Sequence, residues 1–368
     1  MRGELHFEEE HGQVVCTLQT PADSHRVDVT LDSVDRALDV VDQLFAQHDI
    51  IHDDEPIDSI GLRIVAPSSY FMQDHVFDEE VERRLEGLSS LAPIHIQATL
   101  AELRGLRYTY PSVPIVGVSD SAFHRTKPPY AWNYGIDIHD ADTHEIKRFG
   151  YHGISVASAV DALWNRGKLP PKVIVCHLGS GSSVSAVFHG RSIDTTMGYT
   201  PLEGVLMATR SGDISPGAVR ALQSKLGLNW KETEAYLNQH AGLLGIGGSN
   251  DIRELLTRED DGEHLAHLAL TTLVHTIHKA IGSMMVALNG CDLLVFTGTV
   301  GERSAVLRKR IVAHLEFADF ILDGTLNDAC TSPDTFTSIS QAAKSKPIIV
   351  IPTDEAREIA KHCIAATK

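Results

Sequence analysis

Apolar residues recur in two patterns along this chain. Short runs rich in Val and Ile predict strands, and longer segments with apolar residues three or four positions apart predict helices. The expected strands are 57–67, 113–120, 172–178, 182–190, 193–196, 291–298 and 346–354. The expected helices are 31–45, 79–92, 152–167, 218–227, 230–242, 263–290, 302–315 and 355–366. Strands that alternate with helices are typical of the α/β class.

Polar or glycine-rich residues directly follow four of the apolar strands. In open α/β sheets, ligands collect at the carboxyl ends of strands, where loops and helix N-termini present backbone N–H groups. Glycine at such a place lets the backbone approach a phosphate group without a Cβ in the way. The residues at these strand ends are Asp120, Gly179 and Gly181, Gly298 and Gly301, and the pair Asp354 and Glu355.

The turn at 179–181, in the string HLGSGSS, is the clearest of these candidates. No Gly-Lys-Ser/Thr follows it and the next element is expected to be a strand, so it is not a Walker loop. A strand, a glycine-rich turn and a second strand form the hairpin phosphate cradle of actin-like and sugar-kinase-like ATPases. An ordinary hairpin turn has the same local pattern, and both interpretations stay open for this string alone.

Composition narrows the possible partners more than it narrows the fold. The 368 residues are enough for two domains and carry a formal net charge of −17 at pH 7. So acidic a chain is a poor partner for nucleic acid or an anionic membrane, and no apolar run reaches membrane-spanning length. The five cysteines are scattered without CxxC spacing, which favours a reducing compartment over a disulfide framework or structural zinc. We therefore expect a cytoplasmic protein.

Longer strings around these turns resemble the blocks of the acetate kinase family, the ATP-dependent short-chain carboxylate kinases, in the family's order. The strings are SDSAFHRTKPPYA, EIKRFGYHGIS, VCHLGSGSSVSAV, SIDTTMGYTPLEGVLMATRSGDISPG, LLVFTGTVGERS and VIPTDEAREIA. The resemblance covers residues 57–368, and less closely 28–56, and the block at 193–217 is its most specific part.

The resemblance implies phosphoryl transfer from ATP to a small carboxylate such as acetate or propionate, which gives an acyl phosphate and requires Mg²⁺. It also implies the two-domain actin-like ATPase fold, with ligands in a cleft between the domains. We expect an N-terminal α/β domain on the substrate side at 1–121 plus 357–368, and a nucleotide-binding α/β domain at 122–356. A homodimer is likewise implied by the family.

Five side chains match the family's transfer site, and their chemistry suits the reaction. A carboxylate is ionised at neutral pH, so the catalyst must mainly bring two anions together and neutralise charge on the transferring phosphoryl group. Arg63 and Arg210 match the family's two arginines, and His152 matches the histidine that stabilises the transferring group. Asp120 and Glu355 match the acidic pair that positions Mg²⁺ and its waters, and hard oxygen ligands suit that ion.

Further positions match binding contacts of the family. The substrate-binding positions are Arg63, Val65, Ile94, His95 and Pro201, with Val65, Ile94 and Pro201 forming an apolar pocket for the short acyl chain. The nucleotide-binding positions are His177, Gly179, Ser180, Gly181, Asp251, Arg253, Gly298, Gly301 and Glu302.

The residues of the transfer site also have plain structural explanations. Arg63, near the end of a strand, can form a surface salt bridge, and Asp120 can cap the turn that follows it. Glu355 opens a helix, where an acidic side chain is favoured by the helix dipole. His152 also lies at a helix start, where a histidine with a structural role is common. These alternatives stay open for each residue taken by itself.

Several positions on the nucleotide side depart from the family. Ser180 and Arg303 stand where the family has asparagine, Thr299 stands where it has glycine, and Ile252 replaces an aromatic residue. The remaining departures are Ile96 for an asparagine, Val156 for a histidine, and RIVAPSS where the family has RVVHGG. Family members also open with an apolar strand and an Asn-x-Gly-Ser-Ser-Ser-x-Lys turn, whereas MRGELHFEEEHGQVVCTLQ matches the strands that would follow it.

These departures leave three hypotheses for function. The first is a divergent carboxylate kinase with altered handling of the nucleotide, because the transfer-site side chains are intact. The second is a catalytically impaired, kinase-like protein that binds nucleotide or regulates a partner. The third is a kinase for a hydroxyl acceptor, which needs a positioned base such as Asp120, but the two arginines favour a carboxylate.

Overall fold

The computed structural model describes residues 4–10, 13–19, 24–27, 29, 38–48, 50, 56–91 and 93–368. The chain divides into two compact units. The first unit comprises Met1–Ala66, Asp74–Val118 and Ile359–Lys368, and the second comprises Pro67–Gln73 and Ser119–Glu358. The predicted domain boundaries at 121 and 357 stay predictions.

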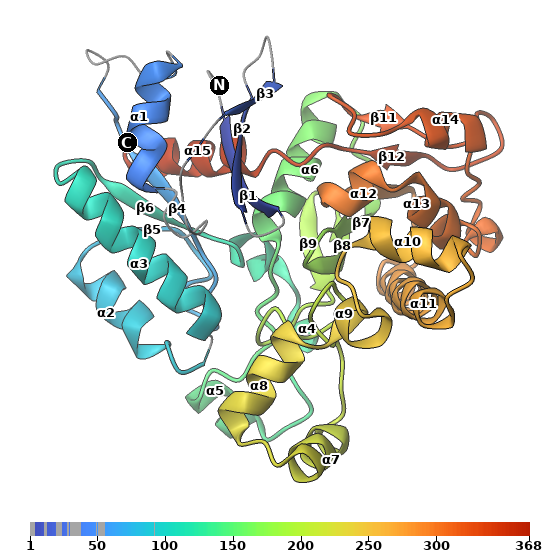
Figure 1. The fold of residues 1–368 in the computed structure, drawn as a ribbon, viewed down its shortest axis with the longest axis horizontal. Coiled ribbons are helices and arrows are strands. Elements are labelled where there is room, and N and C mark those ends of the chain that lie inside the picture. The colour runs from blue at the N-terminus through green and yellow to red at the C-terminus, as the bar shows by residue number, and fades with distance from the viewer. Residues whose placement is uncertain are drawn as a thin grey trace. The chain divides into compact units, whose positions relative to one another are not determined.

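The first unit contains two small sheets and the helices that follow them along the chain (Figure 1). The N-terminal strands pair antiparallel in the order β1-β2-β3, so strands that are neighbours in the sequence are neighbours in this sheet. The second sheet has the order β4-β6-β5. The elements of this unit are β1 (Glu4–Glu10), β2 (Gln13–Gln19), β3 (Ser24–Val27), α1 (Leu38–Gln47), β4 (Ile60–Ile64), β5 (His75–Val76), α2 (Glu79–Gly87), α3 (Pro93–Thr109) and β6 (Ile115–Ser119).

The second unit is built on a six-stranded sheet with the order β11-β12-β10-β7-β8-β9. The central strands β12, β10 and β7 are parallel, and β8, β9 and β11 pair antiparallel with their neighbours. The strands are β7 (Lys172–Leu178), β8 (Ser182–Phe188), β9 (Arg191–Thr195), β10 (Leu293–Thr297), β11 (Thr337–Ser338) and β12 (Ile348–Val350). The parallel order places the carboxyl ends of β7, β10 and β12 at the same edge of the sheet.

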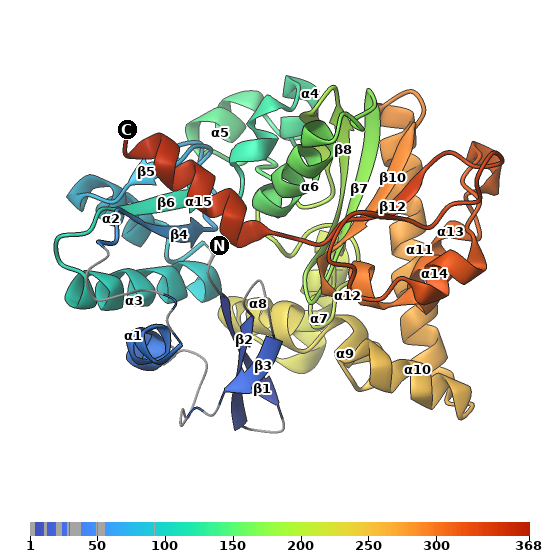
Figure 2. The ribbon, with the colours of Figure 1, turned by 90° about the horizontal axis from the view of Figure 1, so that it is seen from above.

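Helices cover both faces of this sheet, which explains why its central parallel strands are apolar runs (Figure 2). Along β7, Ile174 and Cys176 pack into the core that contains α11 (His264–Ala287). The alternate residues Val173 and Val175 pack into a second core with α6 (Gly153–Asn165). Because strand side chains alternate between faces, a run of apolar residues is what a strand buried on two sides requires.

The other helices of the second unit flank this framework. Their bounds are η2 (Ala122–Thr126), α4 (Pro129–Trp132), α5 (Ile138–Thr143), α7 (Pro216–Leu226), α8 (Trp230–Gln239), α9 (Gly242–Gly247), α10 (Ile252–Asp260), α12 (Gly298–Arg303), α13 (Ala305–Val312), η3 (Glu316–Ala318) and α14 (Gly324–Ala329). Helix α15 (Glu355–Ala366) begins in the second unit and continues in the first. Within the described part of the chain, no helix has both the length and the apolar composition needed to cross a membrane.

The predicted helix at 302–315 is wrong in its bounds. Helix α12 already begins at Gly298, and α13 is separated from it by Ser304. Ser304 has φ −97° and ψ 88°, and its side chain accepts a hydrogen bond from the Leu307 N–H, so it caps the second helix. The five cysteines, two in the first unit and three in the second, are free thiols and all are buried.

Candidate active site

Asp120 directly follows strand β6, where a buried apolar run ends in a carboxylate. Its side chain is 0% exposed, and Oδ2 accepts a hydrogen bond of 2.8 Å from the His152 N–H. Its backbone carbonyl accepts a second bond of 2.8 Å from the Gly153 N–H. Two backbone donors at the start of α6 therefore hold Asp120 in place, and the positive end of the helix dipole stabilises its negative charge. The alternative from the sequence was that Asp120 caps the turn directly after it, whereas these two contacts are with the start of α6.

His152 is held in an unusual conformation. Its φ is 59° and its ψ is 22°, the left-handed region that non-glycine residues seldom adopt. The ring is nearly buried, with Nδ1 3.0 Å from the Ser183 hydroxyl, and it stacks on His177 with 4.2 Å between ring centroids. His177 Nδ1 in turn lies 2.7 Å from the Ser155 hydroxyl. Strained backbone of this kind concentrates at functional sites, where the surrounding contacts maintain it.

The three-residue turn at 179–181 joins β7 to β8 as a tight hairpin. Leu178 pairs with Ser182, and the Gly179 N–H donates to the Gly181 carbonyl over 3.0 Å. A Cβ added to Gly181 would lie 3.1 Å from His152 Nε2 and 3.5 Å from Arg210 Nη1. The absence of a Cβ at 181 therefore leaves space beside the imidazole, and the turn, the imidazole and the guanidinium converge at one place.

Arg210 lies in an irregular segment that other contacts hold. Its Nη1 donates to the Pro201 carbonyl over 3.3 Å, and its own carbonyl accepts from the Met207 N–H over 3.1 Å. Earlier in the same segment, Glu203 forms an ion pair with Arg148 and accepts a hydrogen bond from the Tyr134 hydroxyl. Burial, together with the Glu203 carboxylate, raises the pKa of Tyr134, so its hydroxyl stays a donor. This network of contacts holds part of the segment 193–217, the most specific block in the sequence.

The second glycine-rich turn joins β10 to α12. Gly298 has φ 78°, and a Cβ there would lie 2.7 Å from the Leu178 carbonyl oxygen. Its N–H donates to the Thr353 hydroxyl over 2.9 Å. Glu302, on the same helix, accepts from the Thr353 N–H and from its hydroxyl, both over 2.9 Å. This turn is thus bound to the segment between β12 and α15.

Arg308 anchors the other end of α12. Its guanidinium is fully buried and donates to the carbonyls of Gly301 and Glu302 over 2.8 and 2.9 Å. Further bonds reach the side chain and carbonyl of Asn327 and the Cys330 carbonyl. Burial lowers the pKa of this arginine, and the five bonds compensate for its lost hydration. One side chain therefore binds two of the carbonyls at the end of the short helix.

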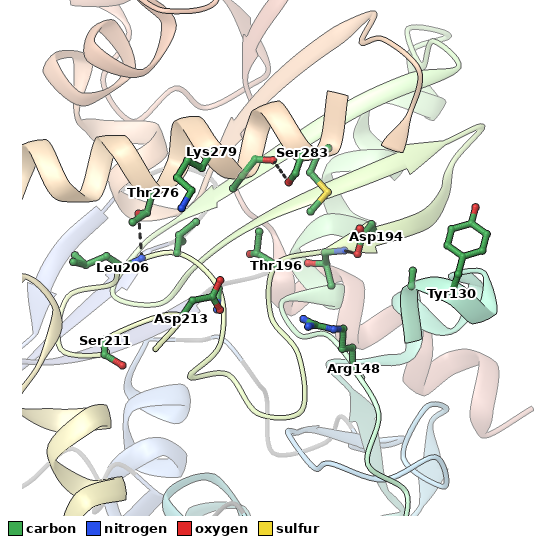
Figure 3. Close-up of a pocket in the computed structure, with 16 residues that line it drawn as sticks. Tyr130, Arg148, Asp194, Thr196, Leu206, Ser211, Asp213, Thr276, Lys279 and Ser283 are labelled. Atoms are coloured by element: carbon green, nitrogen blue, oxygen red, sulfur yellow. Dashed lines mark hydrogen bonds between the residues drawn. The ribbon is translucent and has the colours of Figure 1, made fainter. Parts of the chain in front are cut away.

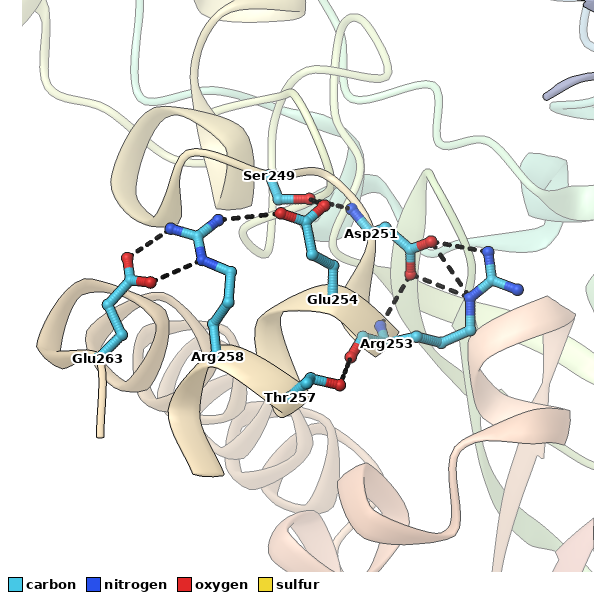
Figure 4. A network of polar contacts seen from close by, with 7 residues as sticks. All are labelled: Ser249, Asp251, Arg253, Glu254, Thr257, Arg258 and Glu263. Atoms are coloured by element: carbon cyan, nitrogen blue, oxygen red, sulfur yellow. Dashed lines mark hydrogen bonds and ion pairs between the residues drawn. The ribbon is translucent and has the colours of Figure 1, made fainter. Parts of the chain in front are cut away.

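Asp251 and Arg253 contact each other at the start of α10 (Figure 4). Asp251 accepts from the Arg253 N–H over 2.8 Å and pairs with its guanidinium over 2.7 Å. The hydrogen bonds from Arg253 lower the pKa of Asp251. The adjoining Arg258 pairs with Glu254 and Glu263. Asp251 therefore caps α10, and the predicted contacts of Asp251 and Arg253 with the nucleotide stay predictions.

Glu355 is the first residue of α15, and the residue before it organises that helix start. Asp354 accepts a hydrogen bond from the Arg357 N–H over 3.0 Å, and the Asp354 N–H lies 3.3 Å from the Ser158 hydroxyl of α6. Asp354, rather than Glu355, therefore caps the helix, and Glu355 is half-buried beside the cap.

Other predicted substrate residues belong to the first unit. Arg63 is half-buried in β4, and Val65, directly after that strand, is 8% exposed. Ile94 and His95 lie in the first turn of α3, and their side chains are outside the part that the structure describes. The roles of these four residues stay predictions. Pro201 is a buried residue of the second unit.

A pocket of about 470 Å³ lies between α11 and the segment 194–213 (Figure 3). Arg148, Asp194, Ser211, Asp213 and Lys279 are among its polar lining residues. Burial raises the pKa of Asp194. Ser211 directly follows Arg210, so the pocket adjoins the segment that carries the predicted catalytic arginine. Among the described residues, the pocket lining includes none of the residues predicted for the site.

The residues gathered in the second unit suit an anionic ligand and a hard cation. The glycine at 181 leaves space that a Cβ would fill, beside a guanidinium and an imidazole. Asp120 supplies a buried carboxylate, the oxygen chemistry that Mg²⁺ prefers. Mg²⁺ keeps several waters and needs few protein ligands, so it does not require a cage of three side chains. Among the described residues, no group of three or more His, Cys, Asp or Glu is placed to hold a metal.

Sequence reasoning missed the side chains that support the site. Ser155 and Ser183 orient the two imidazoles, and Thr353 binds the second turn. One signal for Ser183 was available in the sequence, because the predicted strand carries three serines among apolar residues; in β8 all three are fully or almost fully buried. A buried hydroxyl needs a hydrogen-bond partner, and such a strand therefore indicates polar neighbours.

Comparison with known proteins agrees with these features. The sequence profile of the acetokinase family matches residues 7–361. The acetate kinase of Clavibacter michiganensis is 37% identical over 359 residues, covering 94% of this chain and 90% of that protein. The acetate kinase of Carboxydothermus hydrogenoformans is 39% identical over 321 residues, covering 86% and 80%.

Two solved structures match over nearly the whole chain. A propionate kinase from Francisella tularensis superposes with a TM-score of 0.85 at 31% identity, covering 99% of this chain and 100% of that one. The acetate kinase of Porphyromonas gingivalis gives a TM-score of 0.84 at 29% identity, covering 100% and 93%. These matches confirm the predicted α/β fold of the acetate and sugar kinase class, and the chain belongs to the acetokinase family.

Proposed function

We propose that this protein transfers the terminal phosphoryl group of ATP to the carboxylate of acetate or propionate and so forms an acyl phosphate. The family membership and the names of the relatives support this reaction. The observation that carries the proposal is the convergence of His152 Nε2 and Arg210 Nη1 on the glycine at 181. A cation and a buried imidazole at a strand-end turn provide what two approaching anions need.

The side chains have distinct roles in this proposal. Arg210 neutralises charge on the transferring group, and His152 stabilises that group from its position against the turn. The stack on His177 and the Ser183 contact keep the His152 ring in place, so no reorganisation is needed during transfer. No general base is assigned, because the acceptor carboxylate is already ionised.

Asp120 and Glu355 are the residues that we propose to hold Mg²⁺ through its waters. The ion, when bound, supplies positive charge to the phosphate oxygens. Asp120 suits this role because its carboxylate is buried and fixed by the start of α6. We assign Arg63, Val65, Ile94, His95 and Pro201 to the acid substrate on the basis of their matching sequence motifs.

A trapping assay tests the proposed function directly. The purified protein is incubated with ATP, Mg²⁺ and acetate, propionate or butyrate, and acyl phosphate is captured with hydroxylamine. We expect product with acetate or propionate and a dependence on Mg²⁺. Absence of product with every acid at high protein concentration, while ADP still binds, contradicts the proposal and favours a nucleotide-binding protein without turnover.

We also propose a homodimer located in the cytoplasm. Leu265 and Leu268, one turn apart on α11, are 51% and 43% exposed, and this apolar pair supports an interface there. The five buried free thiols are consistent with a reducing compartment. Light scattering on a size-exclusion column tests the assembly, and a molar mass near that of one 40.2 kDa chain would contradict it.

A further inference from the structure

The Thr353 hydroxyl is a junction between segments that are far apart in the sequence. Oγ1 lies 2.9 Å from the Gly298 N, 2.8 Å from the Thr297 hydroxyl oxygen and 2.9 Å from Glu302 Oε1. The Thr353 N–H adds a bond of 2.9 Å to the same Glu302 oxygen. The end of β10, the start of α12 and the segment before α15 therefore meet at one oxygen atom.

The hydrogen bonds at this oxygen have only one consistent set of directions. The carboxylate of Glu302 can only accept, so the single proton of the Thr353 hydroxyl goes to it. The Gly298 N–H can only donate, and it occupies one lone pair of Oγ1. The Thr297 hydroxyl, which is fully buried, must then donate to the other lone pair. The hydroxyl donates once and accepts twice, so its bonding capacity is filled.

Gly298 was expected to present its backbone to the nucleotide, and this arrangement changes that expectation. Its N–H is directed to Thr353 inside the protein, and the positive φ brings its backbone against the Leu178 carbonyl. The turn is thus fixed by internal bonds, and its position is coupled to Thr353. Glu355, assigned to the metal, follows Thr353 by two residues.

We propose that Thr353 is a positioning residue that keeps the Gly298 turn and the start of α15 in register. The proposal rests on the assignment of nucleotide to the turn and of Mg²⁺ to Glu355 under the proposed function. Thr353 itself contacts neither ligand in this scheme. It acts through Gly298 and Glu302, so its loss should impair binding of nucleotide and metal more than the transfer step.

The test compares Thr353→Val, which replaces the hydroxyl by a methyl group of similar size, with Thr353→Ser, which keeps the hydroxyl. Thr337→Val makes the same change in β11, where the hydroxyl bonds only to a neighbouring carbonyl among the described contacts. Three quantities are measured: ADP affinity by calorimetry, the Mg²⁺ concentration that gives half-maximal turnover, and amide hydrogen exchange of the peptide 297–303.

We expect Thr353→Val to weaken ADP binding about tenfold and to raise the Mg²⁺ requirement, with kcat at saturation changed less. Exchange in 297–303 should accelerate about tenfold because the Gly298 N–H loses its acceptor. Thr353→Ser and Thr337→Val should stay close to the unmodified protein in all three measurements. Unchanged ADP affinity and exchange in Thr353→Val, or a loss of kcat alone, overturns the proposal.

A second variant decides the matter if Thr353→Val does not fold. Thr297→Val removes one of the bonds to the junction oxygen and leaves the others, so intermediate effects on exchange and ADP affinity are expected, and no effect overturns the proposal. Failure of the proposed function is recognised separately. In that case the unmodified protein forms no acyl phosphate, whereas exchange in 297–303 still reports on the junction.

Discussion

The two glycine-rich turns of the second unit look alike in sequence but are built differently. The turn at 179–181 has ordinary backbone angles at its glycines and faces two side chains, His152 and Arg210. The turn at Gly298 has a positive φ, and its N–H and its helix are bound internally through Thr353. In the first turn glycine provides space for functional groups, and in the second it allows a backbone conformation.

This difference separates two kinds of defect. Changes at the first turn should impair the chemistry and leave the fold intact, because no backbone strain is introduced. Changes at the second turn should affect stability and nucleotide binding first. The following variants test that separation, from the largest expected effect to the smallest.

Arg210→Ala removes the cation that faces the first turn. We expect turnover in the hydroxylamine assay to fall by about 100–1000-fold, the effect of losing one preorganised contact to the transferring group. The melting temperature should change little, because the contact of the guanidinium with the Pro201 carbonyl is long, at 3.3 Å. Arg220→Ala, at an exposed position on α7, is the matched control. Turnover that survives in Arg210→Ala refutes the role given to this arginine.

The stability of the fold should depend on pH through His124, which contacts the residue before His152. Its ring is fully buried, with Nδ1 2.8 Å from the Ser192 hydroxyl and Nε2 3.0 Å from the Tyr151 carbonyl. Burial, aided by the nearby Lys127 charge, lowers the pKa of His124 from 6.5 to about 3. The neutral ring stabilises the fold above pH 6.5, and this contribution is lost as the pH falls toward 3, because the unfolded chain binds the proton first.

The free energy of unfolding should therefore fall by about 1.4 kcal/mol per pH unit between these values from His124 alone. Urea unfolding between pH 7.5 and 5 measures the slope. His124→Gln, which keeps a donor for the Tyr151 carbonyl, should show a shallower slope over the same range. Equal slopes in the two proteins would mean that His124 is not the group responsible.

Gly298→Ala and Gly181→Ala compare the two turns directly. Alanine at 298 must adopt a left-handed backbone against the Leu178 carbonyl, so we expect at least about 1–2 kcal/mol of lost stability in urea unfolding. Alanine at 181 has no such strain but displaces the His152 ring by a few tenths of an ångström, which should reduce turnover about tenfold.

Gly135→Ala, with open space around the added Cβ, controls for the substitution itself. The distinction between the turns fails if Gly181→Ala is the less stable of the two, or if Gly298→Ala binds ADP and melts like the unmodified protein.

Ser180→Asn should have the smallest effect and the opposite sign. Ser180 is exposed at the tip of the first turn, and the sequence resemblance predicts the longer asparagine side chain there. One added hydrogen bond, about 1 kcal/mol, would tighten ADP binding about fivefold. Calorimetry measures the change. Equal or weaker binding by Ser180→Asn would show that this departure does not limit the nucleotide site.

Much of the second unit could be predicted because its local signals agree. The run KVIVCHL is apolar on both faces and bounded by a proline pair and a glycine, and β7 occupies these seven residues. Helix α11 is likewise close to its expected bounds because a long periodic segment ends at Asn289 and Gly290. Such signals lie within a few residues of the element that they define.

The supporting contacts could not be predicted, because their partners are distant in the sequence. Thr353 and Gly298 are 55 residues apart, and His152 and Ser183 are 31 apart. Helix α3 was also not predicted, since its apolar residues are spread around the helix and do not form one stripe. The break at Ser304 depends on a cap within an otherwise helical pattern, which composition alone does not reveal.

The buried cysteines make the two units separately observable. Cys16 and Cys363 lie in the first unit, and Cys176, Cys291 and Cys330 lie in the second. Burial raises the pKa of these thiols, to about 11 for Cys291, so the folded protein presents almost no reactive thiolate. Alkylation mapped by mass spectrometry during slow denaturation would thus record which unit opens first, without any introduced label.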